Sequence, residues 1–436
     1  MKKFLVFALI LVSVLALAKV KIQFWHAMGG WRIELLQSMA EDFMKTHPDI
    51  EVEVQYTGSY RDTLNKLIAA VKGGTPPHIV QVYEIGTQFM IDGDIAVPIE
   101  DLIKEDPTFD IGKFLPQVLD YYRVGGKLYS MPFNSSNPIL YYNKTLFKEA
   151  GLDPDKPPRT FKELVEYCRK LTVKDEKGNI VRAGITWPLH SWFFEQFVAL
   201  QNAPLVDNEN GRTGRATKAV FNHEAGLRFL KLWDTLTKEG LMINTTKEDW
   251  TGARQLFISQ KVAMLISSTS DVKLMMDAAK ENGFELGTAF LPKPEGVELG
   301  GTPIGGGSLW IIKGHPKEEI KAAWEFVKWM AEPEQQIRWH LGTGYFPVRK
   351  DAVETLLYQG YYSKYPHHLT ALLQLLLSVQ TPNTRGAVIG PFPEVRDIIE
   401  TAIERMINGE MTPEEALSWA EKEATKAIKE YNELYE

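Results

Sequence analysis

Two stretches far apart in the chain carry groups suited to binding an anion. Gly305–Ser308, with the sequence GGGS, leaves consecutive backbone N–H groups unobstructed, which suits an anion or a sugar hydroxyl. Arg396 follows Pro393–Glu394 and so falls in the first turn of a predicted helix, where the macrodipole disfavours a cation. A guanidinium placed beside free N–H groups makes a strong anion pocket. Each stretch also has an ordinary interpretation, because the glycines could form a mobile hairpin or hinge turn and Arg396 could be an exposed arginine.

The segment Met131–Asp153 is the stretch around which we expect the rest of the chain to be organised. Pro138 keeps its first part out of a helix, Ile139–Tyr142 is an apolar run of strand type, and Asn143 is a predicted helix N-cap. Between them lie three small hydrogen-bonding residues, Asn134–Ser136, where the backbone can approach a ligand closely. We expect the segment to cross between two lobes and to place these polar groups along their cleft. The alternative is a polar turn before a buried strand.

Signatures of common enzyme and metal chemistries are absent from the sequence. It contains no GxxxxGK[ST] phosphate loop, no HExxH zinc motif and no GxSxG nucleophile elbow. Cys168 is the only cysteine, which leaves no disulfide, no cysteine-based zinc site and no redox pair. We therefore predict no catalytic residue, no cofactor and no metal. Four tryptophans near predicted strand ends or loops could stack on a polyol, although core packing is the better explanation for any single one: Trp25, Trp31, Trp187 and Trp192.

Alternating strands and helices position these groups in the first third of the chain. The hydrophobic pattern predicts, in order, a strand, a helix, a strand, a helix and a strand: Val20–Trp25, Trp31–Thr46, Glu51–Tyr56, Tyr60–Lys72 and His78–Tyr83. This order predicts a parallel sheet with right-handed crossovers. Ligands bind at the carboxyl ends of such strands, which predicts one rim formed by Trp25–His26, Tyr56–Tyr60 and Tyr83–Glu84.

The length, charge and N-terminus bound the protein class. A chain of 436 residues is too long for one core and predicts at least two domains. The formal net charge of -7 argues against a general nucleic-acid binder. Residues 1–18 are predicted to be a cleavable signal peptide, with Lys2 and Lys3 before the apolar run Phe4–Leu15 and with Ala16–Ala18 as the cleavage site. An uncleaved anchor is the alternative. Because no cysteine follows the signal, we expect a periplasmic protein without a lipid anchor.

Ordered short motifs along the whole mature chain resemble the bacterial extracellular solute-binding proteins of the maltose-binding type, and within them the receptors that serve import of glycerol-3-phosphate. The motifs that carry the resemblance are Phe24–His26, Gln81–Glu84, Pro132–Ser136, Leu140–Asn143, Ala263–Met264, Gly305–Trp310, Gly344–Tyr345 with Pro347, and Pro393–Arg396. The resemblance implies an α/β, two-lobe periplasmic binding protein fold of type II, in which each lobe is a mixed sheet flanked by helices and several chain crossings form the hinge. It assigns residues 19–130 and 287–332 to lobe 1 and residues 131–286 and 333–436 to lobe 2.

The same resemblance implies a binding protein rather than an enzyme. It implies a monomer that closes on its ligand and delivers it to the permease of an ABC importer in the inner membrane. The ligand contacts fall on Tyr60, Glu84, Ser136, Ser268, Gly306, Tyr345 and Arg396. Arg396, the Gly306 N–H, Tyr345 and the serines suit a phosphate, whereas Tyr60 and Glu84 suit glycerol hydroxyls.

The chain departs from the family pattern at its tryptophan loop, Trp187–Trp192, which is shorter by a residue. Either tryptophan could stack on the ligand, and we favour Trp192. Because this loop adjoins the far end of the ligand, a glycerophosphodiester such as glycerophosphocholine is a further candidate. Two alternatives stay open: an oligosaccharide receptor of the same fold, which would have no use for Arg396, and a secreted hydrolase.

Overall fold

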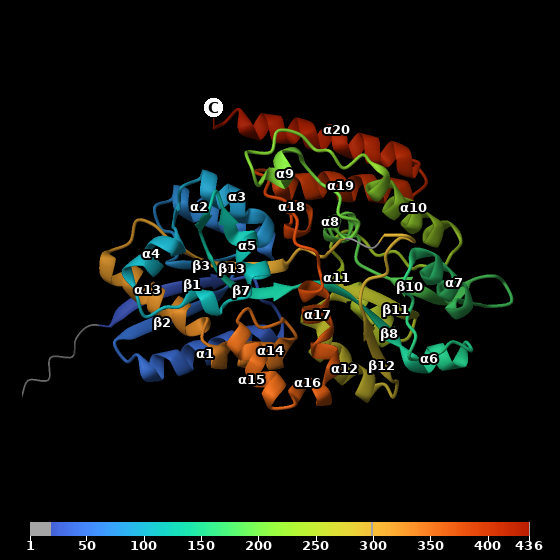
Figure 1. Cartoon of the computed structure of the whole chain (residues 1–436), viewed down its shortest axis with the longest axis horizontal. Coiled ribbons are helices and arrows are strands. Elements are labelled where there is room, and N and C mark those ends of the chain that lie inside the picture. The colour runs from blue at the N-terminus through green and yellow to red at the C-terminus, as the bar shows by residue number, and fades with distance from the viewer. Residues whose placement is uncertain (1–18, 298–299, 436) are drawn as a thin grey trace, which may run out of the picture.

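The computed structural model describes residues 19–297 and 300–435, and the predicted signal peptide lies outside them. Two sheets lie side by side, each with helices packed around it (Figure 1). The C-terminal helices α19 (Phe392–Ile407) and α20 (Pro413–Asn432) run together along one side of the molecule. No helix within residues 19–297 or 300–435 combines the length and the apolar content that a bilayer span requires.

The first sheet begins with the predicted parallel unit. Strand β1 (Val20–His26) pairs in parallel with β2 (Ile50–Tyr56) on one side and with β3 (Ile79–Tyr83) on the other. The crossover helices are α1 (Trp31–Thr46) and α2 (Tyr60–Lys72), with the bounds that the sequence predicts. The predicted bounds of both helices are confirmed, because the local sequence signals for them are strong. Ser59 and Asp62 form a reciprocal capping box at the start of α2.

The glycine-rich stretch is a strand and not a hairpin turn. Strand β13 (Gly305–Ile312) lies antiparallel between β3 and the short β4 (Ala96–Val97), and β7 (Met131–Ser136) pairs with its first half. A Cβ on Gly306 would lie 1.8 Å from the Asn134 carbonyl oxygen, and its φ of +96° favours glycine. The glycines therefore allow two backbones to approach closely at the edge where Ser136 lies.

The second sheet has the order β12 (Leu286–Ala289), β8 (Pro138–Asn143), β11 (Val262–Ser268), β10 (Ile180–Thr186) and β9 (Val173–Lys174). Only the β10–β11 pair is parallel, so the sheet is mixed. Every residue of β8 and β11 is buried, because helices cover both faces. The helices between β8 and β12 are α6 (Lys144–Glu149), α7 (Phe161–Leu171), α8 (Ser191–Ala199), α9 (Asp207–Gly211), α10 (Glu224–Lys238), α11 (Trp250–Ile258) and α12 (Val272–Glu281).

The segment Met131–Asp153 crosses between the lobes as expected, but six residues later than the predicted boundary. Strand β7 belongs to the first sheet and β8 to the second, so the chain crosses at Asn137. It returns between β12, in the second sheet, and β13, in the first. The boundaries at residues 131 and 287 are therefore corrected: residues 131–136 belong with lobe 1 and β12 with lobe 2. The reason at residue 131 is the pairing of β7 with Gly305–Leu309, and at residue 287 it is the pairing of β12 with β8. Nothing local in the sequence encodes either pairing.

Residues 333–436 do not all belong to lobe 2. Helix α14 (Pro333–Thr343) contacts both α1 of the first lobe and α12 of the second, whereas α19 and α20 pack on α10 of the second lobe. The other helices after β13 are α13 (Lys317–Met330), α15 (Lys350–Tyr358), α16 (Tyr361–Lys364), α17 (Thr370–Leu376) and α18 (Pro382–Arg385). The first lobe also carries α3 (Thr87–Asp92), α4 (Ile99–Glu105), α5 (Pro116–Tyr122) and the hairpin of β5 (Arg123–Val124) with β6 (Lys127–Leu128).

Candidate functional site

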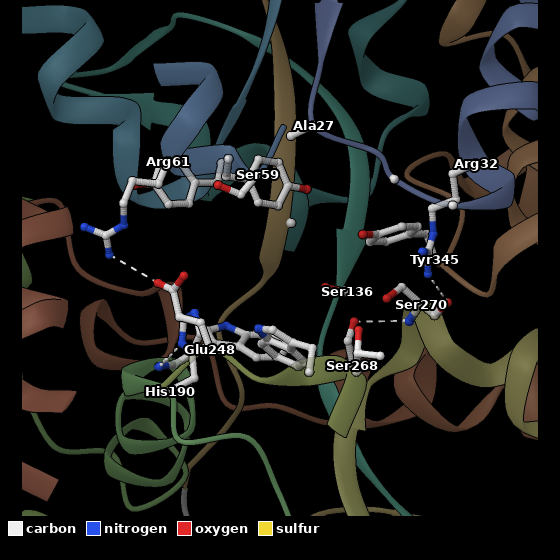
Figure 2. A pocket seen from close by; sticks show the side chains of 18 of the residues that line it. Ala27, Arg32, Ser59, Arg61, Ser136, His190, Glu248, Ser268, Ser270 and Tyr345 are labelled. Atoms are coloured by element: carbon white, nitrogen blue, oxygen red, sulfur yellow. Dashed lines mark hydrogen bonds and ion pairs between the residues drawn. The ribbon is translucent and has the colours of Figure 1, made fainter. Parts of the chain in front are cut away.

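A cavity of about 590 Å³ is lined by residues of both lobes (Figure 2). Its volume is in the range of small-molecule sites. The structure brings all eight predicted ligand contacts to its wall: Tyr60, Glu84, Ser136, Trp192, Ser268, Gly306, Tyr345 and Arg396. That these residues contact a ligand stays a prediction.

Strand ends account for much of this wall. Tyr56 ends β2 and Tyr83 ends β3, so these two strands face the cavity with their carboxyl ends as predicted. At the end of β1 the wall is formed by Ala27 and not by the predicted Trp25 and His26. From the second sheet, Ser268 ends β11 at the same cavity. Ser136 ends β7, next to the crossing between the lobes. The cavity thus sits where strands of both sheets terminate.

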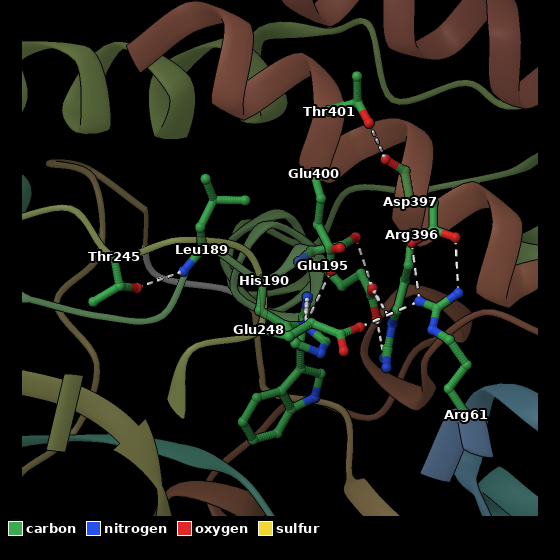
Figure 3. A network of polar contacts seen from close by, with 12 residues as sticks. Arg61, Leu189, His190, Glu195, Thr245, Glu248, Arg396, Asp397, Glu400 and Thr401 are labelled. Carbon is green, nitrogen blue, oxygen red and sulfur yellow. Dashed lines mark hydrogen bonds and ion pairs between the residues drawn. The ribbon is translucent and has the colours of Figure 1, made fainter. Parts of the chain in front are cut away.

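Arg396 is buried and already paired with two carboxylates, of which Figure 3 shows Glu195. Its Nε donates to Glu195 Oε1 at 2.7 Å, and its Nη2 donates to Glu84 Oε1 at 2.6 Å and Glu195 Oε2 at 2.8 Å. Among the described residues, Nη1 has no partner, which leaves it as the donor for a ligand. Helix α19 starts at Phe392, so Arg396 is its fifth residue and lies beyond the free N–H groups. The prediction that Arg396 lies in the first turn of its helix is therefore wrong by one residue, and the two carboxylates explain its burial.

The three charges of this cluster do not cancel. Burial by itself would lower the pKa of Arg396, but the Glu195 and Glu84 carboxylates outweigh it and raise that pKa. Burial raises the pKa of the Glu84 carboxyl, and Arg396 opposes this rise. One guanidinium between two carboxylates leaves one net negative charge. Arg396 therefore offers a directed hydrogen bond rather than an unopposed positive charge.

Hydrogen-bonding groups suited to a polyol lie beside this cluster. Tyr60 Oη accepts a hydrogen bond from Asn134 Nδ2 at 2.6 Å, so the phenol keeps its own proton to donate. Asn134 is fixed in turn because its Oδ1 accepts from Gln81 Nε2 at 2.7 Å. Glu84 Oε2 makes no hydrogen bond within the described part of the chain. The Tyr60 hydroxyl can thus donate a hydrogen bond to a ligand hydroxyl, and Glu84 Oε2 can accept one.

The structure separates the two candidate tryptophans. Trp192 lines the cavity, whereas Trp187 is fully buried, with Trp233 in an edge contact at 5.1 Å between ring centroids. Trp250, which was not among the predicted residues, also lines the cavity, with its ring centroid 6.0 Å from that of Trp192. Gly305 makes room for this arrangement, since a Cβ there would lie 2.5 Å from Trp192 Cζ2.

Arg61 connects the two lobes at one side of the cavity (Figure 3). From α2 its Nη1 and Nη2 donate to Asp397 Oδ2 and Oδ1 of α19 at 2.7 and 3.0 Å. Its Nη2 also donates to Glu248 Oε1 at 3.2 Å. These residues were missed because no local motif relates Arg61 to partners 187 and 336 positions away.

Arg32 connects the lobes at the other side, where Figure 2 shows it beside Ser270 and Tyr345. Its Nη2 donates to the Ser270 carbonyl at 2.8 Å and lies 3.8 Å from Asp271 Oδ1. Arg254 Nε donates to Asp271 Oδ2 at 2.9 Å. Both arginines line the cavity, and neither was among the predicted residues.

His190, Glu248 and Glu400 bring three potential metal-ligand atoms within 4.8 Å of one another. However, His190 Nδ1 accepts the Trp192 N–H at 3.0 Å and so caps α8. Burial and the nearby Arg396 and Arg61 charges lower the pKa of His190, whereas burial raises that of Glu400 to about 7. The lone pair of Nδ1 is thus engaged, and we assign no metal to this group.

Comparison with known proteins identifies relatives along nearly the full length. Residues 29–337 match the sequence pattern of the bacterial extracellular solute-binding protein family. The sn-glycerol-3-phosphate-binding periplasmic protein UgpB of Salmonella paratyphi A is 33% identical over 424 residues, which span 95% of this chain and 94% of that protein. UgpB of Escherichia coli K12 is 32% identical over 422 residues, with the same coverage.

Solved structures share the fold. UgpB from Mycobacterium tuberculosis in complex with glycerophosphocholine superimposes with a TM-score of 0.80 at 21% identity, covering 94% of this chain and 99% of that one. The GacH receptor of Streptomyces glaucescens, solved unliganded and with acarbose, gives 0.79 at 21% identity over 95% and 99%. The predicted two-lobe α/β architecture of the maltose-binding type is confirmed.

Proposed function

This chain belongs to the bacterial extracellular solute-binding protein family. From this premise we propose that it is a periplasmic receptor that binds glycerol-3-phosphate or a glycerophosphodiester and delivers it to the permease of an ABC importer. One observation carries the proposal: the eight predicted ligand contacts, which are far apart in the sequence, line a single cavity between the lobes. The cleavable signal, the periplasmic location and the monomeric state belong to the same proposal.

The groups around the cavity give the ligand an orientation. Tyr60 and Glu84 bind the polyol hydroxyls, and Trp192 stacks on its carbon face. Ser136, Ser268, the Gly306 backbone and Tyr345 hydrogen-bond the phosphate. Arg396 holds Glu84 and Glu195 in place and offers its Nη1 to the ligand.

Titration calorimetry tests this function with sn-glycerol-3-phosphate, glycerophosphocholine and maltose as separate ligands. We expect the first or the second to bind, and Tyr345→Phe and Ser268→Ala to weaken it by about threefold to tenfold, one neutral hydrogen bond each. Tyr358→Phe is the matched control, since Tyr358 is 98% exposed and lies outside the cavity. Failure of both phosphate ligands to bind at millimolar concentration would refute the proposal.

An oligosaccharide receptor is the second candidate, favoured by the aromatic pair Trp192 and Trp250 in the cavity wall. Tight binding of maltose without binding of either phosphate ligand would select it. A hydrolase predicts turnover instead, so choline release from glycerophosphocholine incubated with the protein would identify that class. Stable binding without product supports the receptor.

A further inference from the structure

The cavity carries opposite charge imbalances at its two ends. At one end, two guanidinium groups, Arg32 of α1 and Arg254 of α11, face one carboxylate, Asp271. Asp271 is fully buried and Arg32 is 8% exposed, so water screens this cluster poorly. One net positive charge remains. At the other end, Arg396 lies between Glu84 and Glu195, and Arg61 binds Asp397 and Glu248.

The positive end also has unused hydrogen-bond donors. Arg32 Nε is buried and makes no hydrogen bond within the described part of the chain. Helix α1, sixteen residues long, opens at the cavity with Gly30 as its N-cap, and no side chain caps its first N–H groups. These groups and the helix macrodipole favour an anion. Hydroxyls from Ser268, Ser270 and Tyr345 complete this end of the wall (Figure 2).

An anionic group placed at the negative end would meet the opposite situation. Each arginine there is outnumbered by carboxylates, so an added phosphate would be repelled by the excess negative charge. Hydroxyl groups suit that end instead, because carboxylate oxygens accept hydrogen bonds from them. The two imbalances therefore orient a ligand that has one anionic end and one polyol end.

We infer that Arg32 and Arg254, held by Asp271, form the anion subsite of the cavity and supply its electrostatic selectivity for a phosphate-bearing polyol. Arg396 serves the polyol end instead, where it holds Glu84 in place and offers its Nη1 to a hydroxyl. This inference rests on the proposed function. It adds three residues that no motif in the sequence identified. It also predicts that the neutral oligosaccharides bound by other members of this fold bind poorly here.

Calorimetric titration of the mature protein with sn-glycerol-3-phosphate, at low ionic strength, tests the subsite. Arg254→Gln and Arg32→Gln should each weaken binding by about tenfold or more, the loss of a charge-assisted contact. Asp271→Asn should leave binding as tight as in the wild type or tighter, because it raises the net charge of the subsite. The double variant Arg254→Gln/Asp271→Asn should recover part of the loss. Arg169→Gln is the control, an arginine bound by Glu239 on the surface outside the cavity.

The sign of the Asp271 effect separates charge selection from a structural role. If the cluster were only structural, Asp271→Asn would weaken binding as much as the arginine variants, since Asp271 holds both arginines. That result would overturn the inference, and so would folded Arg254→Gln and Arg32→Gln variants that bind within about threefold of the wild type. If a glutamine variant fails to fold by circular dichroism, Arg254→Lys and Arg254→Met decide. Lysine keeps the positive charge at the cavity wall and predicts retained binding, whereas methionine removes that charge and predicts the same loss as glutamine. Equal binding by these two variants would refute the inference.

Failure of the proposed function would give a different pattern. If the wild-type protein binds neither glycerol-3-phosphate nor glycerophosphocholine, the proposed ligand class is wrong, and the subsite is then tested with inorganic phosphate. Phosphate binding that Arg254→Gln abolishes and Arg169→Gln preserves would support the anion subsite on its own. No binding of phosphate, or binding that both variants retain equally, would overturn it.

Discussion

Replacing Arg396 with methionine leaves Glu84 and Glu195 buried without their guanidinium partner. Three charge-assisted hydrogen bonds of 2.6 to 2.8 Å are lost, and both carboxylates keep their low exposure. Removing one partner from a buried ion pair typically costs about 3–5 kcal/mol, because the remaining charge stays desolvated. We therefore expect the free energy of unfolding of Arg396→Met at pH 8 to fall by about that amount.

The loss should depend on pH in a defined direction. Burial already raises the pKa of Glu84, and removing Arg396 takes away the charge that opposes this rise. The folded variant then binds protons at pH values where the unfolded chain has released them, so its stability falls as pH rises through that interval. Each unit of pKa difference corresponds to about 1.4 kcal/mol. The deficit of Arg396→Met should therefore be smaller at pH 5 than at pH 8.

Urea unfolding followed by circular dichroism at both pH values measures the deficit. Arg169→Met is the matched control, because Arg169 binds Glu239 through the same two-pronged geometry on the surface, and we expect no measurable change. Arg396→Met combined with Glu84→Gln and Glu195→Gln should recover most of the stability, since no buried charge remains. An Arg396→Met variant as stable as the wild type at pH 8, or a loss that does not vary with pH, would refute this reasoning.

Three further predictions follow from other contacts. Burial raises the pKa of Glu400 to about 7, so the folded state loses stability as pH rises from the ordinary carboxyl range through 7. Glu400→Gln should therefore stabilise the protein by up to about 3 kcal/mol at pH 8 and give no gain near pH 4.5. The midpoints of urea unfolding at the two pH values measure this difference. Gly306→Ala should cost about 2–4 kcal/mol of unfolding free energy because its Cβ would meet the Asn134 carbonyl. Arg61→Gln, which removes the ion pairs with Asp397 and Glu248, should speed ligand dissociation about twofold to fivefold in stopped-flow fluorescence.

Each of these predictions has a control and a contrary outcome. Equal stability of Glu400→Gln and the wild type at pH 8 would contradict the first. Gly178→Ala has a similar positive φ but open space around it, so it should cost less than Gly306→Ala; an equal cost would show that the close approach is unimportant. Arg169→Gln should leave dissociation unchanged, and an Arg61→Gln rate equal to the wild-type rate would show that the contact between lobes does not hold the ligand.

Local signals in the sequence were sufficient for the first three strands and two helices. Helix α2 illustrates why, because a capping box at Ser59 starts it and Gly73 and Gly74 follow its last residue. The pairing of β7 with β13 was beyond such reasoning, since it joins residues 131–136 to residues 305–309 and depends on close backbone approach. The predicted domain boundary at residue 131 was wrong for that reason.

The candidate site was predictable to a similar extent. The resemblance to a family named seven residues that line one cavity, and Trp192, which we favoured over Trp187, lines it as well. The ion pairs of the cavity were not predictable, because Arg396 binds Glu84 and Glu195, which lie 312 and 201 positions away in the sequence. The positive cluster was missed for the same reason. Its net charge arises only when the fold brings together Arg32, Arg254 and Asp271.

The central position of β13 has a consequence for biosynthesis. Strands β3, β4 and β7 all pair with it, yet it is made only when the ribosome reaches residues 305–312. A nascent chain therefore cannot close its first sheet until about three quarters of its length exists, and pairings so distant in sequence form slowly.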